Sequence, residues 1–368
     1  MANDIKVGIT HGDYNGIGYE VILKMLEDPE ILELCTPVVY GSAKIAANYR
    51  KELGIQGLPL QQIKSTGDAQ PGKAYIINIV GEDARVETGH PSPEAGKAAF
   101  AALERAVADL REGEIDVLLT APVNKATIHS DLFPFPGHTE YLETSLGTEG
   151  DKALMILFNE NLRVALASIH VPISKVSESI TVENLMEKIK LFEQSLIKDF
   201  GIVKPRIAVL GLNPHAGDEG LLGTEEKEVI LPAIEQCHNE KIHVFGPYAA
   251  DGFFGSGNFS KFDGVLAMYH DQGLAPFKTI AGGSGVNFTA GLPYVRTSPD
   301  HGTGYDIAGQ GVASPDSIRQ ALFAALDIYR NRERHAERTA NPLRRQYVDK
   351  SDKSEKSDKS DKKEKGKN

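Results

Sequence analysis

Three histidines, His170, His215 and His270, each end a short hydrophobic run and are followed at once by proline, glycine or polar residues. Apolar runs of this kind are typical of buried strands in an α/β sheet. Ligands of open α/β sheets bind beyond the carboxyl ends of the strands. Three imidazoles placed there could bind one divalent metal ion and leave a coordination position free for substrate. Three unrelated loop histidines would give the same pattern, so the spacing alone leaves both interpretations open.

A second group of polar residues follows the last of these histidines. Lys278, Asn287 and Arg296 recur at intervals of nine residues between His270 and His301. Lysine and arginine are the usual ligands of phosphate and carboxylate groups, and asparagine adds a neutral donor. Upstream, His138 and Thr139 open a predicted helix whose first amides could also bind an anion. These residues predict a site for an anionic metabolite, and Asp251 and Asp271 are carboxylates that could move a proton or support a metal ligand.

Glycine-rich segments suggest close contact with a phosphate or a dinucleotide. The segment Asn15-Gly16-Ile17-Gly18 follows the first expected strand, but it lacks the third glycine and the later acidic residue of a Rossmann fingerprint. The segment Gly282-Gly283-Ser284-Gly285 is the better candidate for close backbone approach to a cofactor, although a loop without a ligand would look the same.

The rest of the chain alternates between expected strands and helices. Strands are expected at 5–10, 37–40, 74–80 and 115–120 and before the three histidines; helices are expected at 19–27 and 93–111, after caps at Thr181 and Thr224, and after Ser314-Pro315. This alternation indicates a largely parallel sheet in an α/β/α arrangement.

Composition narrows the class of protein. The chain has 368 residues, which favours two lobes, and a net charge of -11, which argues against nucleic acid as the main partner. Cys35 and Cys237 form no disulfide framework, and no signal peptide or membrane-spanning stretch is evident, so we expect a cytoplasmic protein without membrane contact. The Ser-Asp-Lys repeats at 348–368 contain almost no apolar residues and are expected to be a disordered charged tail.

Four motifs together resemble the 4-hydroxythreonine-4-phosphate dehydrogenases, the NAD-dependent family of pyridoxal phosphate (vitamin B6) biosynthesis. The resemblance extends from Lys6 to about Tyr329. The motifs are Gly137-His138-Thr139-Glu140-Tyr141-Leu142, Leu212-Asn213-Pro214-His215-Ala216-Gly217, Tyr269-His270-Asp271-Gln272-Gly273-Leu274 and Arg296-Thr297-Ser298-Pro299-Asp300-His301-Gly302-Thr303.

The resemblance implies a role for each group of candidate residues. It implies a divalent metal (Zn, Mg or Co) at His170, His215 and His270, and substrate contacts at His138, Thr139, Lys278, Asn287 and Arg296. It also implies a homodimer whose active site lies at the subunit interface. The implied fold is a two-lobed α/β/α fold like those of isocitrate and isopropylmalate dehydrogenases, rather than a Rossmann fold. We expect the first lobe at 1–135 plus 297–347 and the second, with most ligands, at 136–296.

The implied reaction is the oxidation of 4-phosphohydroxy-L-threonine to 2-amino-3-oxo-4-phosphooxybutanoate, which decarboxylates to 3-amino-2-oxopropyl phosphate. Asp251, Asp271 and Lys278 are the catalytic candidates, and Gly282, Gly283, Ser284 and Gly285 the candidates for binding NAD. Three alternatives remain open: a dehydrogenase of D-erythronate or D-threonate 4-phosphate, a three-histidine zinc hydrolase, and a non-catalytic protein that binds a phosphorylated metabolite.

Overall fold

Twelve strands form a single sheet in the computed structural model, which describes residues 5–55, 59–81, 84–129, 133–135 and 137–341. The expected tail at 348–368 lies outside these residues. The strands are β1 (Lys6–Thr10), β2 (Thr36–Gly41), β3 (Gln61–Ile63), β4 (Tyr75–Asn78), β5 (Val117–Thr120), β6 (Leu154–Phe158), β7 (Arg163–Leu166), β8 (Ile207–Leu210), β9 (Val244–Tyr248), β10 (Gly264–Ala267), β11 (Val286–Ala290) and β12 (Val295–Pro299).

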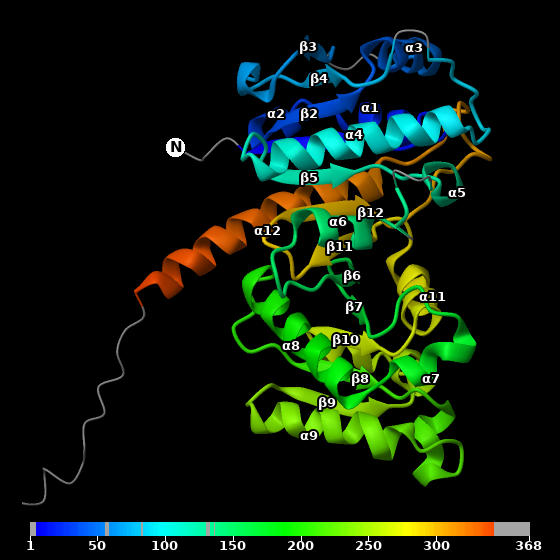
Figure 1. Ribbon diagram of the computed structural model, residues 1–368, viewed down its shortest axis with the longest axis vertical. Coiled ribbons are helices and arrows are strands. Elements are labelled where there is room, and N and C mark those ends of the chain that lie inside the picture. Colours follow the sequence, from blue (N-terminus) through cyan, green and yellow to red (C-terminus); the bar gives the residue numbers. More distant parts are fainter. Residues whose placement is uncertain (1–4, 56–58, 82–83, 130–132, 136, 342–368) are drawn as a thin grey trace, which may run out of the picture. The chain divides into compact units, whose positions relative to one another are not determined.

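The strand order is β3-β4-β2-β1-β5-β12-β11-β6-β7-β10-β8-β9. Eight of the neighbouring pairs are parallel, and the pairs β12-β11, β11-β6 and β6-β7 are antiparallel. The expectation of a largely parallel sheet is therefore confirmed, with an antiparallel section in the middle of the sheet (Figure 1).

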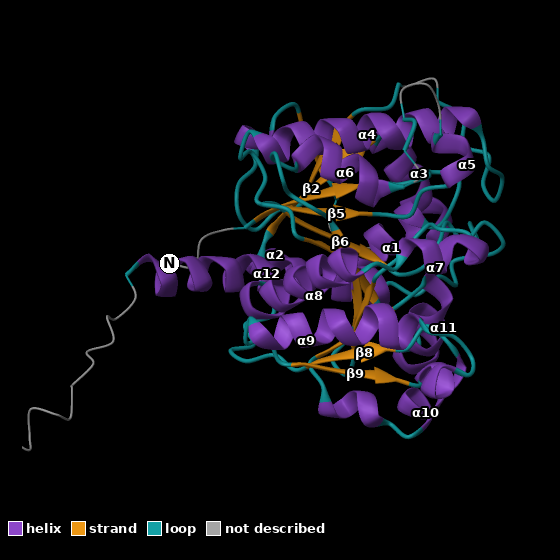
Figure 2. Ribbon diagram, turned by 60° about the horizontal axis from the view of Figure 1, so that its bottom comes forward, coloured by secondary structure: helices purple, strands orange, loops and turns teal. Residues whose placement is uncertain are grey.

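Helices connect most of the strands, as the alternating pattern predicts. They are α1 (Gly18–Met25), α2 (Ile31–Leu34), α3 (Ala43–Leu53), α4 (Pro93–Arg111), α5 (Lys125–Ile128), α6 (His138–Leu146), α7 (Val176–Ser179), α8 (Val182–Lys198), α9 (Leu231–Asn239), α10 (Ala250–Gly255), α11 (His270–Ala281) and α12 (Asp316–Ala340). In both Figure 1 and Figure 2, α5, α7 and α11 lie toward the same end of the strands.

The strands bury both faces, which gives the expected α/β/α layers. In the first part of the sheet, Val7 and Ile9 of β1 pack into the cluster that contains α1 and α12, whereas Val38 and Tyr40 of β2 pack into the cluster that contains α4. In the other part, alternate residues of β8 and β10 pack toward α8 and α9 or toward α10 and α11. Burial on both faces explains why these strands are continuous apolar runs.

Local capping explains several helix starts. The Ser92 side chain accepts from the amide of Ala95 at the start of α4, and Thr181 accepts from Asn184 at the start of α8, as expected. The helix expected after Thr224 begins at Glu225, and the Thr224 carbonyl accepts from the amides of Lys227 and Glu228. Its first turn is π-helical, in η4 (Glu226–Ile230), which precedes α9. The Glu225 carboxylate accepts from Ser177 and Asn213, so tertiary contacts also hold the start of this helix.

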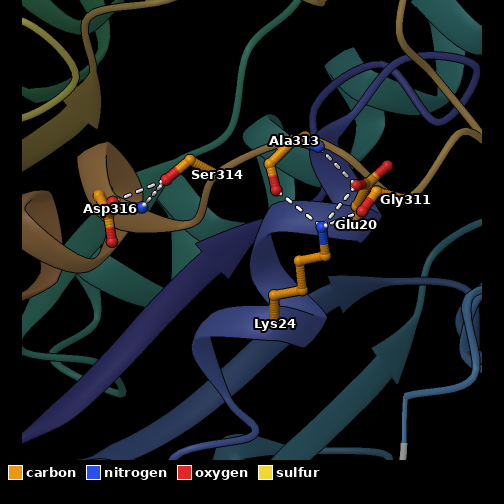
Figure 3. Close-up of polar contacts among 6 residues, drawn as sticks. All are labelled: Glu20, Lys24, Gly311, Ala313, Ser314 and Asp316. Atoms are coloured by element: carbon orange, nitrogen blue, oxygen red, sulfur yellow. Dashed lines mark hydrogen bonds and ion pairs between the residues drawn. The ribbon is translucent and has the colours of Figure 1, made fainter.

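A buried ion pair ties α1 to the loop that precedes α12 (Figure 3). The Glu20 side chain is fully buried; its Oε1 accepts from Lys24 Nζ at 2.8 Å and from the amide of Ala313 at 2.8 Å. Lys24 Nζ also donates to the carbonyls of Gly311 and Ala313. These hydrogen bonds hold the segment from Gly311 to Ala313, just before α12, against α1.

The strand order has two halves that come from different parts of the sequence. The six strands from β3 to β12 come from residues 61–63, 75–78, 36–41, 6–10, 117–120 and 295–299, and the other six come from 154–290. By their internal contacts, the residues up to Arg332 form one unit and those from Glu333 onward another. This division differs from the expected lobe boundaries, so the two lobes stay a prediction. The site described below lies entirely within the first unit. In the described ranges, no helix combines the length and the apolar character needed to cross a bilayer.

Candidate active site

A cavity of about 350 Å³ collects most of the residues that the sequence singles out. Its wall is built by the ends of β5 and β12, the start of α6, and parts of α5, α11 and β11. Seven of the predicted residues line it: His138, Thr139, His170, His270, Lys278, Asn287 and Arg296. Residues far apart in the chain thus meet in one place, as the motifs predict.

Arg296 is the most deeply buried charged group of the cavity, with 3% of its surface exposed. It donates to Thr120 Oγ1 at 2.6 and 3.0 Å and to Thr289 Oγ1 at 3.2 Å. Among the described residues it forms no ion pair with a carboxylate. Burial lowers the pKa of Arg296 to about 9. A buried guanidinium without a carboxylate is costly, and this arrangement is typical of a site that binds an anion.

Three further polar atoms in the wall have no partner in the described part of the chain. They are His138 Nε2, Asn287 Oδ1 and His301 Nε2, and all three are buried. Burial, together with the positive charges of Arg296 and Lys125, holds the pKa of His138 well below its usual range, so the imidazole is neutral near pH 7. His138 and Asn287 can therefore form neutral hydrogen bonds with a ligand.

Two of the histidines that line the cavity are oriented by carboxylates. His170 Nδ1 lies 3.0 Å from Glu140 Oε1, and His270 Nδ1 lies 2.7 Å from Asp271 Oδ1. The hydrogen bond from His170 lowers the pKa of Glu140. When Nδ1 donates its proton to a carboxylate, the lone pair of the neutral ring is on Nε2, where a metal can bind it. His170 and His270 thus have the donor arrangement that a divalent metal requires.

His215 does not line this cavity. It lies in the exposed 3-10 segment η3 (Pro214–Gly220), where His215, Ala216, Asp218 and Glu219 all have positive φ angles between 42° and 58°. Residues with side chains rarely adopt this conformation, so the segment is strained. The described residues of the chain contain no group of three His, Cys, Asp or Glu side chains that could bind a metal. A three-histidine site within one chain is therefore not formed here.

The remaining candidates lie outside the cavity lining. Asp251 is exposed on α10, and Asp271 is exposed beside His270. The segment Gly282 to Gly285 connects α11 to β11 and does not line the cavity, although it lies close to it. A Cβ added to Gly285 would lie 2.1 Å from Asp300 Oδ2, so glycine is needed for this close packing. The proposed roles of these residues stay predictions.

The cavity residues that were not assigned from the sequence include Thr120, Lys125, Asp300 and His301. Thr120 ends an apolar strand and is indistinguishable there from a core residue. Asp300 and His301 stand inside a quoted motif, which could have pointed to them. His301 Nδ1 contacts the carbonyl of Gly302 at 3.0 Å, and its buried Nε2 has no partner among the described residues.

The charge balance of the cavity favours an anionic ligand. The described lining residues include three cationic side chains, those of Lys125, Lys278 and Arg296, and one carboxylate, that of Asp300. This positive local balance occurs in a chain with a net charge of -11. A small metabolite with more than one negative group fits such a site.

Comparison with known proteins identifies similar sequences over most of the chain. Residues 33–325 match the family model described as pyridoxal phosphate biosynthetic protein PdxA. The chain is 56% identical over 348 residues to the 4-hydroxythreonine-4-phosphate dehydrogenase of Bacteroides thetaiotaomicron, covering 95% of each chain. It is 39% identical to a protein of Oceanobacillus iheyensis that is named provisionally as a D-threonate 4-phosphate dehydrogenase, covering 89% of this chain and 99% of the other.

Solved structures share the fold. The crystal structure of 4-hydroxythreonine-4-phosphate dehydrogenase from Klebsiella pneumoniae matches with a TM-score of 0.76 at 32% identity, covering 89% of this chain and 99% of the other. The enzyme of the same name from Burkholderia phymatum matches with a TM-score of 0.71 at 37% identity, covering 88% and 98%. The arrangement of strands and helices described above is therefore shared with solved proteins.

Proposed function

Because the chain belongs to the family of the pyridoxal phosphate biosynthetic protein PdxA, we propose that it is an NAD-dependent 4-hydroxythreonine-4-phosphate dehydrogenase. The reaction is the oxidation of 4-phosphohydroxy-L-threonine to 2-amino-3-oxo-4-phosphooxybutanoate. This β-keto acid then loses carbon dioxide and gives 3-amino-2-oxopropyl phosphate. The guanidinium of Arg296 carries the proposal: it is buried and has no carboxylate partner among the described residues, and the substrate has a phosphate and a carboxylate that can neutralise it.

The protein residues act mainly by binding and orientation. Arg296, Lys278 and Lys125 balance the negative charges of the substrate, and Asn287 and the neutral His138 add hydrogen bonds. Thr120 and Thr289 hold the Arg296 guanidinium in place. Removing water from a cavity with these fixed groups strengthens each electrostatic contact with the substrate. Lys278 lines the cavity and is the catalytic candidate best placed to act there.

His170 and His270 fit a divalent metal, because each has a carboxylate on Nδ1. When bound, such a metal would favour loss of the proton from the substrate hydroxyl, and NAD would accept the hydride from the same carbon. Asp271 holds the His270 ring. Asp251 does not line the cavity, and a role of either aspartate in proton transfer stays a prediction.

The third metal ligand is proposed to come from a second copy of the chain. His215 is exposed on a strained segment and does not line the cavity of its own chain, whereas His170 and His270 do. Exposed Leu221 and Leu222 follow this segment, so it presents apolar surface beside the histidine. A homodimer with two-fold symmetry would bring each His215 to the partner's cavity and complete two equal sites.

One assay separates the proposed function from the three alternatives. Dehydrogenases of D-erythronate or D-threonate 4-phosphate act on substrates without an amino group, and one such name occurs among the relatives. A zinc hydrolase or a binding protein would produce no NADH. We expect NADH formation with 4-phosphohydroxy-L-threonine at a kcat/KM well above that with D-erythronate or D-threonate 4-phosphate. Preference for a four-carbon sugar acid would move the proposal to that substrate, and absence of NADH with all three would reject it.

A further inference from the structure

Three side chains at the cavity form a hydrogen-bonded chain: Glu140, His170 and Lys125. Glu140 Oε1 lies 3.0 Å from His170 Nδ1, and Lys125 Nζ lies 3.1 Å from His170 Nε2. Glu140 lies in the first turn of α6, Lys125 is the first residue of α5, and His170 follows β7. Residues from three separate elements thus occupy both nitrogens of one imidazole.

The partners determine which nitrogen carries the proton. An ionised carboxylate can only accept a hydrogen bond, so Nδ1 of His170 is the donor to Glu140. An ammonium group can only donate, so Nε2 of His170 provides the lone pair that accepts from Lys125. The same lone pair is the one that a metal ion would need. The Lys125 ammonium and a divalent metal therefore cannot use His170 Nε2 at the same time.

The Lys125 ammonium could also bind another group within the same cavity. Its backbone is fixed, because Asn124 Oδ1 accepts from the amides of Ala126 and Thr127, but its side chain is exposed and long. It lines the cavity together with Lys278 and Arg296 and forms no ion pair with a carboxylate in the described part of the chain. An anionic group of a bound substrate is the partner that would neutralise it.

We propose that Lys125 occupies the metal-binding lone pair of His170 until a metal ion displaces it, and that it then binds an anionic group of the substrate. Glu140 is the positioning residue: its contact with Nδ1 of His170 selects the Nδ1–H tautomer and orients the ring that lines the cavity. The inference rests on the proposed function for the identity of the substrate. The competition between Lys125 and a metal ion involves His170, Lys125 and Glu140, and it does not depend on the identity of the substrate.

The first test is titration of the full-length protein, freed of metal by a chelator, with Co²⁺, followed by calorimetry and visible absorbance. Lys125→Met removes the competing ammonium and should tighten Co²⁺ binding about threefold to fivefold, as expected for an exposed polar pair. Glu140→Gln should weaken Co²⁺ binding by about 10- to 100-fold, as for other groups that orient metal ligands. Lys278→Met is the matched control: among the described residues the hydrogen bond to His170 Nε2 comes from Lys125 and not from Lys278, so Lys278→Met should tighten binding less than Lys125→Met does.

The second test uses substrate. Lys125→Met should raise KM for 4-phosphohydroxy-L-threonine about tenfold or more with a smaller change in kcat, and Lys125→Arg should restore part of the loss. Unchanged or weaker Co²⁺ binding by Lys125→Met, or equal tightening by Lys278→Met, would overturn the competition for His170. An unchanged KM would overturn the substrate contact. If Lys125→Met does not fold by circular dichroism, Lys125→Gln replaces it. The Co²⁺ titration needs no turnover, so its result is independent of whether the proposed substrate is oxidised.

Discussion

The guanidinium of Arg296 donates two hydrogen bonds to one hydroxyl oxygen, Thr120 Oγ1, at 2.6 and 3.0 Å. In the described residues this buried cation has neutral partners only. Stability alone does not account for a charge at this position, since an apolar side chain of similar size would avoid the desolvation cost; the proposed binding of an anion would account for it.

Replacement of Arg296 should consequently separate stability from binding. We expect Arg296→Met to melt at the same temperature as the wild type or higher, because an uncompensated buried charge is removed. Inorganic phosphate should raise the Tm of the wild type and have a smaller effect on the variant. Differential scanning fluorimetry with increasing phosphate measures both effects. A large fall in the Tm of Arg296→Met would show that the guanidinium is structural.

His11 should make the protein sensitive to acid. It is fully buried and stacks on Tyr19 and Tyr14. Burial lowers the pKa of His11 to about 4. The folded state therefore resists protonation that the unfolded chain accepts below about pH 6.5, and stability is lost as the pH falls through that range.

The size of this effect can be measured with a variant. From pH 7.5 to pH 5 the His11 contribution should cost about 2 kcal/mol of unfolding free energy. His11→Phe keeps the ring stack. Between pH 7.5 and pH 5 its unfolding free energy, measured with urea, should fall by about 2 kcal/mol less than that of the wild type. An identical pH dependence of both proteins would show that His11 does not titrate as described.

The Glu20–Lys24 pair should stabilise the fold, unlike pairs on the surface. Lys24→Met leaves the buried Glu20 carboxylate without its counter-ion, and we expect a loss of about 2 kcal/mol in urea unfolding. Lys175, whose pair with Glu178 is exposed, is the matched control, and Lys175→Met should change stability by less than about 0.5 kcal/mol. Equal effects of the two variants would contradict a special role for the buried pair.

The proposed sharing of histidines between two chains can be tested by mixing inactive variants. His170→Ala and His215→Ala, unfolded and refolded together, should recover activity at about a quarter of all sites, since half of the dimers are mixed and each mixed dimer has one intact site. His170→Ala with His270→Ala should recover none, because both residues line the same cavity. Recovery in the second pair, or no recovery in the first with mixed dimers confirmed by mass spectrometry, would contradict the proposed arrangement.

Much of the fold could be predicted from local patterns. The helix expected at 93–111 matches α4, because its apolar face repeats at helical spacing and Ser92 caps it. The strands before the three histidines exist, but they end three to five residues earlier than expected, at Leu166, Leu210 and Ala267. The intervening residues include buried apolar side chains, such as those of Ala167 and Met268, that pack in loops, and periodicity cannot distinguish such residues from a strand.

The site could be predicted only in part. His138, Asn287 and Arg296 lie in motifs with a clear chemical pattern, and the structure brings them together. Lys125 and Thr120 stand in segments without such a pattern, and their role depends on contacts with residues 45 and 176 positions away. Contacts at such separations arise from strand order, which the sequence alone does not specify.

The most direct test of the account compares wild-type NADH formation with 4-phosphohydroxy-L-threonine and with 4-hydroxy-L-threonine, the same substrate without its phosphate. The cationic cavity predicts that kcat/KM falls by a factor of about 100 or more without the phosphate, because two or more charge-assisted hydrogen bonds are lost. It also predicts that Lys278→Met or Arg296→Met reduces this difference. Equal kcat/KM for the two substrates would contradict the assignment of this cavity to a phosphorylated substrate.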